Sequence, residues 1–277
     1  MKYPIQKKRR LFRNKRVRRD LIRKPANPRI AVPSFFTLMN LFCGFLSIIS
    51  VSNGDFELGA WLIVIAGLFD ALDGLMARLA NATSEFGMEL DSISDVVSFG
   101  VAPGFFIYTF SLHEMGYVGI ILSALPPLCG AVRLARFNVS SKYDANDDEF
   151  SGLPIPAQAI ILGAFYLAFR DNFELFDSLQ NGINSVLIPV VILASFLMVS
   201  AVPFDKLPRF DRKSIRRNKG KFVLFLFYLF LILSFREIGL IAVFVVFICK
   251  GLFVGGRRFW KQAFVEENDQ YEFIDRY

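Results

Sequence analysis

The feature that most constrains the fold of this 277-residue chain is a series of apolar runs that approach the length of a membrane-spanning helix. Hydrophobic residues make up 54% of the chain and charged residues 21%, so the charges are segregated from the runs. About 20 helical residues cross a hydrocarbon core, and a helix in lipid satisfies its own backbone hydrogen bonds. The runs predict an all-α, polytopic membrane helical bundle of about eight transmembrane helices. They cover residues 33–51, 58–79, 96–112, 117–137, 153–169, 186–203, 221–235 and 238–254.

The distribution of charge predicts the orientation of this bundle. Residues 1–29 contain 13 Lys or Arg and one acid, which is typical of a cytoplasmic segment facing anionic lipids. A nucleic-acid-binding arm is the competing interpretation, but the apolar run that follows favours the membrane, and we expect no nucleic-acid partner. The connection 205–221 holds eight basic residues and two acids, whereas 171–184 holds three acids and no Lys or Arg. Eight spans with both termini cytoplasmic satisfy this asymmetry, and we expect the plasma membrane as the location.

The same pattern predicts four segments. Residues 1–30 form a basic cytoplasmic arm, and residues 31–203 form a membrane domain of six spans. Residues 204–256 add a basic loop and a two-span hairpin, and residues 257–277 form a cytoplasmic tail.

The scarcity of histidine limits the chemistry that this chain can perform. His113 is the only histidine, and the three cysteines all lie inside apolar runs. A metal site with several histidines is therefore excluded, and a histidine-based triad is disfavoured because His113, next to Glu114 and Gly116, is expected to be a solvated turn residue. Any acid–base chemistry must use carboxylates.

Four aspartates flank the junction of the second and third spans. Asp70 and Asp73 are three residues apart and Asp91 and Asp95 are four apart, so each pair shares one helix face. Eight residues separate Arg78 from the next glycine, so the two helices must be antiparallel neighbours whose carboxylates converge. Convergent carboxylates repel one another unless a cation neutralises them. Oxygen ligands without His or Cys favour Mg²⁺, Mn²⁺ or Ca²⁺.

The residues between these aspartates favour phosphate chemistry. Gly74, Ala77 and Gly87 have little or no side chain on the same faces, which leaves room for a ligand. Arg78 offers a bidentate phosphate donor. The combination predicts a two-metal site for phosphoryl transfer. The alternative is that these are ordinary charges at the cytoplasmic ends of helices.

The spacing of these residues resembles a known family. The string Asp70-x-x-Asp73-Gly74-x-x-Ala77-Arg78, followed by Gly87-x-x-x-Asp91-x-x-x-Asp95, resembles the signature of the CDP-alcohol phosphatidyltransferases at all eight fixed positions. Members of that family are integral membrane enzymes, usually dimers. They transfer a phosphatidyl or similar group from a CDP-linked donor to an alcohol and release CMP. The resemblance covers about residues 30–203.

Three further strings are similar to the phosphatidylserine synthase branch of that family. They are Pro33–Asn40 in the first span, Arg133–Asn138 at the end of the fourth, and Gly152–Pro156 before the fifth. This similarity implies transfer of the phosphatidyl group from CDP-diacylglycerol to L-serine, giving phosphatidylserine and CMP in phospholipid biosynthesis.

The resemblance also implies roles for individual residues. Two divalent cations, Mg²⁺ or Mn²⁺ with Ca²⁺ as an alternative occupant, would bind Asp70, Asp73, Asp91 and Asp95, and Asp95 would also be the catalytic base. The residues expected to contact CDP-diacylglycerol are Pro33, Ser34, Thr37, Asn40, Gly74, Arg78, Ser84 and Gly87.

L-Serine is expected to bind at Arg133, Arg136 and Asn138, because a planar guanidinium can grip the serine carboxylate. The alternative is that both arginines only reach toward lipid headgroups. The other expected partners are anionic membrane lipids and a second copy of the chain in a homodimer.

Two other functions remain open at this point. One is the same reaction with another alcohol acceptor, such as glycerol 3-phosphate or inositol phosphate, which the Arg133–Asn138 string disfavours. The other is a divalent-cation transporter whose acids line a conduction path. A transporter should carry its acids near the middle of the membrane, whereas these acids cluster at one end of the spans. A structural scaffold gives no reason for Gly74 and Gly87 at their positions.

Overall fold

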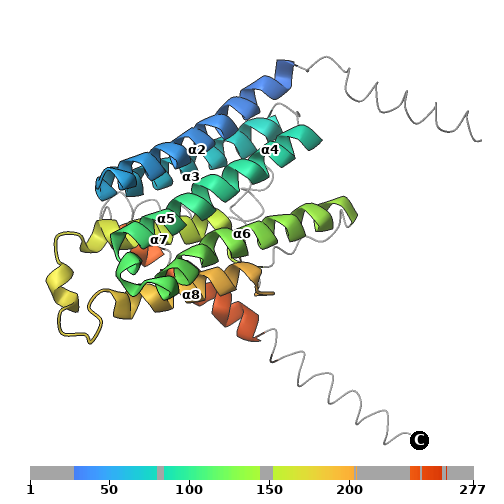
Figure 1. Ribbon diagram of the computed structural model, residues 1–277. Coiled ribbons are helices and arrows are strands. Elements are labelled where there is room, and N and C mark those ends of the chain that lie inside the picture. The colour runs from blue at the N-terminus through green and yellow to red at the C-terminus, as the bar shows by residue number, and fades with distance from the viewer. Residues whose placement is uncertain are drawn as a thin grey trace, which may run out of the picture.

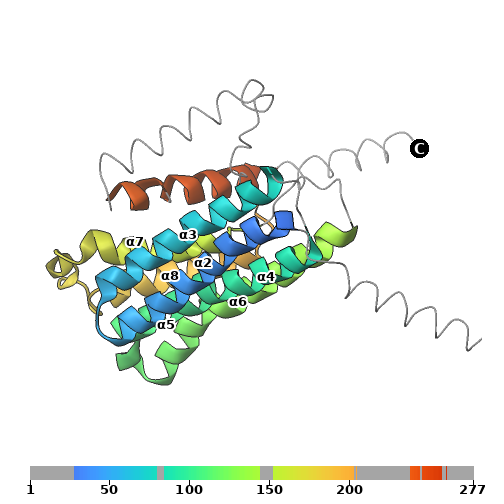
Figure 2. The same cartoon turned by 90° about the horizontal axis from the view of Figure 1, so that it is seen from above.

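The computed structural model describes residues 28–79, 84–143, 152–202, 204, 238–243, 245–257 and 260, and every regular element in these ranges is a helix (Figure 1). The all-helical prediction is therefore confirmed for this part of the chain. Two views at right angles show a bundle whose long helices run in similar directions (Figures 1 and 2). The elements are α2 (Pro28–Ser52), α3 (Phe56–Leu79), α4 (Glu85–Asp95), π-helix η1 (Val96–Val101), α5 (Ala102–Phe110), 3₁₀ helix η2 (Leu112–Met115), α6 (Tyr117–Tyr143), α7 (Ile155–Phe169), 3₁₀ helix η3 (Phe173–Phe176) and α8 (Asn184–Val199).

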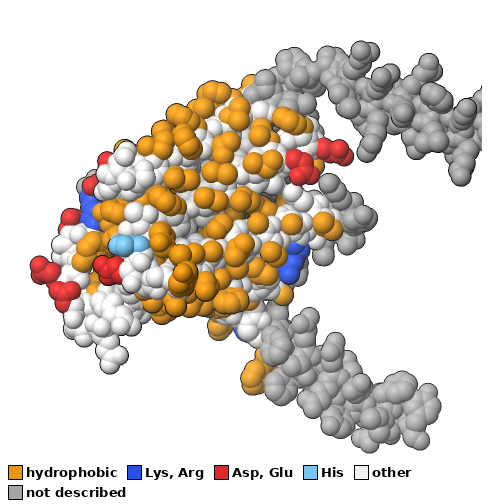
Figure 3. Space-filling view, in the orientation of Figure 1, with side chains coloured by type: hydrophobic (Ala, Val, Ile, Leu, Met, Phe, Trp, Pro, Cys, Tyr) orange, Lys and Arg blue, Asp and Glu red, His pale blue; other side chains and the backbone are white. Residues whose placement is uncertain are grey.

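Five helices are long and apolar enough to cross a membrane: Val32–Ser52, Phe56–Leu79, Glu85–Phe110, Tyr117–Ser140 and Ile238–Arg257. Two further apolar helices, α7 and α8, are shorter. Hydrophobic side chains cover the middle of one face of the bundle, and charged side chains lie toward its two ends (Figure 3). The membrane-like helical bundle is thus confirmed. The count of eight spans stays a prediction, because the span expected at 221–235 lies outside the described residues.

Helix α7 lies inside the bundle. Nine of its residues are buried, and they lie on all sides of the helix, as expected for a helix that is apolar all round. It packs against α3, where Gly163 approaches the backbone of Ala60 and Gly67 accommodates Ile160. This close contact fixes the position of α3 along the axis of the bundle, and the last turns of α3 carry Asp70 and Asp73.

The third span is built from α4, η1 and α5 without a break. A π-helix inserts an extra residue into the helical ladder and is frequent at functional sites, and here it begins directly after Asp95. Gly100 of η1 lies against α6 so closely that an added Cβ would be 2.9 Å from the Cα of Pro127. The π-helix that follows the carboxylate-bearing turn is therefore packed closely against α6, and α4 itself packs against α2.

The opposite end of the bundle is fixed by aromatic and ionic contacts. Phe56, Phe106, Phe110, Tyr166 and Phe173 stack with ring centroids 5.1–6.2 Å apart, joining α3, α5, α7 and η3. Each such pair contributes about 0.5–1.5 kcal/mol beyond its buried area.

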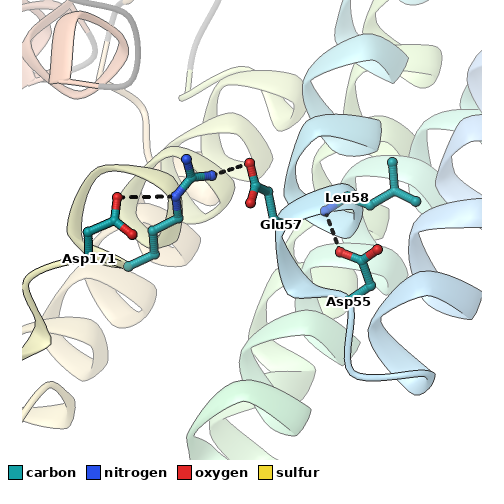
Figure 4. A network of polar contacts seen from close by, with 5 residues as sticks. Asp55, Glu57, Leu58 and Asp171 are labelled. Carbon is teal, nitrogen blue, oxygen red and sulfur yellow. Dashed lines mark hydrogen bonds and ion pairs between the residues drawn. The ribbon is translucent and has the colours of Figure 1, made fainter.

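The ionic contacts at this end centre on one guanidinium (Figure 4). Arg170 pairs with Glu57 at the start of α3 and, at 3.5 Å, with Asp171. The backbone N–H of Leu58 donates to the Asp55 carboxylate at 3.0 Å, which caps α3. Together these contacts tie the first turn of α3 to the end of α7.

Candidate active site

The structure brings three of the four predicted aspartates into one cluster. One carboxylate oxygen from each of Asp70, Asp91 and Asp95 lies within 4.8 Å of the others. Asp73 lies one turn further along α3, is buried, and interacts electrostatically with Asp91. The antiparallel approach of α3 and α4 that the spacing predicted therefore produces one group of carboxylates.

The cluster has the properties of a cation site. Asp73 and Asp95 are each only 6% exposed. The Oδ2 atom of Asp73 and the Oδ1 atom of Asp91 are buried and accept no hydrogen bond. Buried, mutually repelling carboxylates are destabilising unless a cation compensates them. A set of oxygen donors alone suits Mg²⁺, Mn²⁺ or Ca²⁺, so the residues present fit a divalent cation.

Three hydrogen bonds join α2 to the third span, two of them to α4, which carries Asp91 and Asp95, and one to η1. The Ser94 hydroxyl donates to the Thr37 carbonyl at 2.8 Å, and the Ser98 hydroxyl donates to the Asn40 carbonyl at 2.9 Å. Between them, the Asn40 side-chain amide donates from Nδ2 to Oδ1 of Asp95 at 3.2 Å. Asp95 is therefore held by a side chain 55 residues away in the sequence.

A glycine permits this close approach of the two helices. A Cβ added at Gly44 would lie 2.6 Å from the Cα of Ser98. Small residues at four-residue spacing, such as Ser94 and Ser98, are typical of helix contacts in membranes. The four-residue spacing of Ser94 and Ser98 is the sequence signal that could have predicted this contact. Ser94, Ser98 and Gly44 were not among the predicted site residues.

The two predicted serine-binding arginines differ in their surroundings. Arg133 is buried, with 7% of its surface exposed, and interacts electrostatically with Asp95 and Asp70. Arg136 is exposed, and its guanidinium donates to the carbonyl of Val199 at 3.0 Å. Asn138 donates from Nδ2 to the hydroxyl of Ser92 at 3.0 Å. Arg133 therefore lies close to the carboxylate cluster, whereas Arg136 contacts the end of α8.

The residues expected to bind nucleotide lie around the start of α4 and the end of α3. Ser84 caps α4, accepting the N–H of Gly87 at 3.0 Å. Arg78 is exposed, and its nearest guanidinium nitrogen is 3.4 Å from the point where a Cβ of Gly74 would lie. The open space at Gly74 is thus bordered by a cation that can reach a phosphate.

On α2, the expected contact residues are turned toward the protein interior to different degrees. Pro33 and Thr37 are buried, and the Thr37 hydroxyl donates to the Pro33 carbonyl at 3.1 Å. The side chain of Thr37 also approaches Asp73. Ser34 is partly exposed, so it is the more accessible of these residues to a ligand.

Comparison with known proteins identifies a family that includes this part of the chain. The model of the CDP-alcohol phosphatidyltransferase family matches residues 30–205, which contain the whole carboxylate cluster.

Three relatives extend the comparison. A CDP-diacylglycerol–serine O-phosphatidyltransferase of Helicobacter pylori is 38% identical over 208 residues, which are 75% of this chain and 84% of that protein. The archaetidylserine synthase of Methanothermobacter thermautotrophicus is 36% identical over 184 residues, 66% of this chain and 71% of that protein. A CDP-diacylglycerol–serine O-phosphatidyltransferase of Bacillus subtilis is 32% identical over 190 residues, 68% of this chain and 97% of that protein.

Proposed function

This chain belongs to the CDP-alcohol phosphatidyltransferase family, and from that premise we propose how its residues perform the reaction. The protein is an integral membrane CDP-diacylglycerol–serine O-phosphatidyltransferase: it transfers the phosphatidyl group of CDP-diacylglycerol to L-serine and releases CMP. The activity rests on relatives from bacteria and archaea whose names all include serine. The observation that carries the site is the convergence of Asp70, Asp91 and Asp95 at the α3–α4 junction.

Asp70, Asp91 and Asp95, with Asp73 beside them, are the residues that would hold divalent cations. When bound, Mg²⁺ or Mn²⁺ neutralises charge on the pyrophosphate and stabilises the leaving group. The protein's own contribution is to keep four carboxylates in one rigid place. The contacts of α3 with α7 and of α4 with α2 provide that rigidity.

Asp95 is the base of the proposed reaction. Its carboxylate takes the proton of the serine hydroxyl as the hydroxyl oxygen attacks the phosphorus that bears diacylglycerol. A new P–O bond to serine forms, the bond to the bridging oxygen breaks, and CMP leaves with that electron pair. Asp95 suits this role because it is buried and its orientation is set by Asn40, and general-base catalysis depends first on such positioning.

Arg133 is the residue that we assign to the serine carboxylate. It lies in the interior, close enough to Asp95 for electrostatic interaction. The carboxylate and the reacting hydroxyl of one small molecule could therefore be bound together. Arg136 instead donates to the carbonyl of Val199, so its role is to join the end of α6 to α8.

The nucleotide is expected to lie over the small side chains between the aspartates. Gly74 and Gly87 leave space, Arg78 supplies a phosphate contact, and Ser34 reaches the same end of the bundle from α2. Ser84 supports the site by capping α4. The diacylglycerol tails would stay in lipid beside the apolar faces of the helices.

The orientation of the site is also part of the proposal. Helix α3 carries its aspartates in its second half, so an amino terminus in the cytoplasm places them toward the cytoplasmic surface. The basic residues of 1–29 and 205–221 support that orientation. Eight spans, both termini inside, a plasma-membrane location and a homodimer complete the arrangement that we propose.

An acceptor panel tests this function. Purified protein is incubated with CDP-diacylglycerol, Mn²⁺ or Mg²⁺, and one of L-serine, glycerol 3-phosphate or inositol phosphate, and CMP release is measured. We expect release with L-serine, and phosphatidylserine as the lipid product. Release with one of the other alcohols and none with L-serine would contradict the assignment.

A further inference from the structure

The side chain of Asn40 has one polar atom with a hydrogen-bond partner in the protein and one without. Its side chain is wholly buried, with 0% of its surface exposed. Nδ2 donates to Asp95, but Oδ1 is buried and accepts no hydrogen bond. An unsatisfied buried carbonyl is costly, so we expect Oδ1 of Asn40 to accept a hydrogen bond from a ligand when the substrates are bound.

The partner must be a donor that reaches the neighbourhood of Asp95. The amide oxygen is bonded to the same carbon as the nitrogen that donates to Asp95 at 3.2 Å, so a donor that reaches this oxygen lies near Asp95. An amino-acid acceptor supplies such a donor. The hydroxyl and the ammonium of L-serine are on adjacent carbons, so a base that contacts the hydroxyl places the ammonium next to it.

The charge of the surroundings agrees with an ammonium at this point. Asp95 interacts electrostatically with Asp70, Asp91 and Asp73, which makes the region strongly negative. The nearby cationic side chain, Arg133, is suited to the other end of the molecule, the carboxylate. An acceptor that carries phosphate and no ammonium would offer Oδ1 only a neutral hydroxyl donor, which makes a weaker hydrogen bond than an ammonium.

We propose that Asn40 is a positioning and specificity residue with two functions: its amide N–H orients Asp95, and its amide oxygen accepts a hydrogen bond from the ammonium of the amino-acid acceptor. The proposal rests on the serine-transferase function proposed above. It adds that Asn40, which orients Asp95, also binds the ammonium of the acceptor. Asp95 is therefore best placed when an amino-acid acceptor is bound.

The test compares acceptor fragments in the wild type and in Asn40→Leu. Formation of labelled phosphatidylserine from labelled L-serine gives KM and kcat. Two competitors are added in turn: 3-hydroxypropanoate, which lacks the ammonium, and ethanolamine, which lacks the carboxylate. A lost charge-assisted hydrogen bond corresponds to about a ten- to hundredfold change.

In Asn40→Leu we expect the serine KM and the ethanolamine inhibition constant to rise about tenfold or more, and the 3-hydroxypropanoate constant to change little. The kcat should fall as well, because Asp95 loses its donor. Ser47→Ala is the matched control: it also removes a buried hydrogen bond of α2, from the Ser47 hydroxyl to the Gly59 carbonyl at 2.8 Å, and it should leave these constants unchanged.

The isosteric Asn40→Asp provides a second test, which remains informative if Asn40→Leu does not fold. It retains an oxygen for the ammonium but loses the donor to Asp95, so kcat should fall while the serine KM is maintained. Equal effects of Asn40→Leu on all three ligands, or a raised serine KM with unchanged kcat in Asn40→Asp, would overturn the proposal.

Two controls separate this inference from its premises. Binding of Mn²⁺ alone, followed by its electron paramagnetic resonance spectrum, should be the same in the wild type and in Asn40→Leu. A clear loss of Mn²⁺ binding would make Oδ1 a metal ligand and overturn the ammonium assignment. If the wild type makes no phosphatidylserine from L-serine, the proposed function itself fails, and the Asn40 comparison is not needed to show it.

Discussion

The substitution Gly44→Ala tests whether the contact between α2 and the π-helix sets the geometry of the site. The new Cβ would lie 2.6 Å from the Cα of Ser98, and both atoms belong to or adjoin the backbone. Restoring an ordinary contact of 3.4 Å requires the two helices to separate by about 0.8 Å. The strain can be relieved only by that movement, since no flexible side chain can turn away.

The separation would act directly on Asp95. Asn40 precedes Gly44 by one turn, and Asp95 precedes Ser98 by nearly one turn, so the Asn40–Asp95 bond lies beside the strained point. A bond of 3.2 Å lengthened by about 0.8 Å becomes about 4.0 Å, which is no longer a hydrogen bond. Misplacing a catalytic group by about 1 Å can cost about 10²-fold in rate.

We therefore expect Gly44→Ala to lower kcat for serine transfer by about 10- to 100-fold. Overpacking should also lower stability by about 1–3 kcal/mol, partly offset by about 1 kcal/mol of helix propensity. CMP release gives the rate, and thermal unfolding in detergent gives the stability.

Gly163→Ala is the matched control, because its Cβ would meet α3 at 3.4 Å, an ordinary contact. It should keep its activity. If Gly44→Ala also retains wild-type kcat, the helix contact does not position the base and the reasoning fails.

Three further predictions concern separate parts of the molecule. Arg133→Lys should raise the serine KM by about ten- to hundredfold, because the planar fork is lost, and it should affect the KM for CDP-diacylglycerol less; the same assay on Arg136→Lys should show little change. Gln158→Leu should leave the melting temperature unchanged or raised, because both polar atoms of this wholly buried amide lack a partner; a fall in stability of more than about 1 kcal/mol would show that the amide has a partner in the membrane. In intact cells, a cysteine introduced in 171–184 should react with an impermeant thiol reagent and one in 205–221 should not; the reverse labelling would invert the topology.

The features that follow from local spacing were predictable from the sequence. Each aspartate pair had to share a helix face, and the short connection had to make α3 and α4 antiparallel, so the clustering of Asp70, Asp91 and Asp95 follows from helix geometry. The helices were predictable for the same reason: the run expected at 153–169 is α7 (Ile155–Phe169), and the run expected at 117–137 is the first part of α6 (Tyr117–Tyr143).

The features that depend on tertiary contact were not predictable in this way. Nothing in the sequence indicated that Asn40 donates a hydrogen bond to Asp95, which it does because α2 lies against α4; its expected contact with CDP-diacylglycerol stays a prediction. Arg133 and Arg136 were expected to act together because they are three residues apart. In the structure α8 offers a carbonyl to Arg136, and Arg133 faces the interior. The π-helix also has no periodic signal in the sequence, because its extra residue is stabilised by packing on both sides.

The most direct test of the central claim is the rate at which Asp91→Asn transfers the phosphatidyl group to labelled L-serine, compared with the wild type and with Asp177→Asn, an exposed aspartate of the loop before α8. Loss of a ligand that stabilises transition-state charge should cost several kcal/mol, so we expect Asp91→Asn to lose about 10³-fold or more in rate while its melting temperature shows a folded protein. Asp177→Asn should match the wild type. Formation of phosphatidylserine by Asp91→Asn at a rate near that of the wild type would contradict the assignment of the carboxylate cluster as the site of transfer.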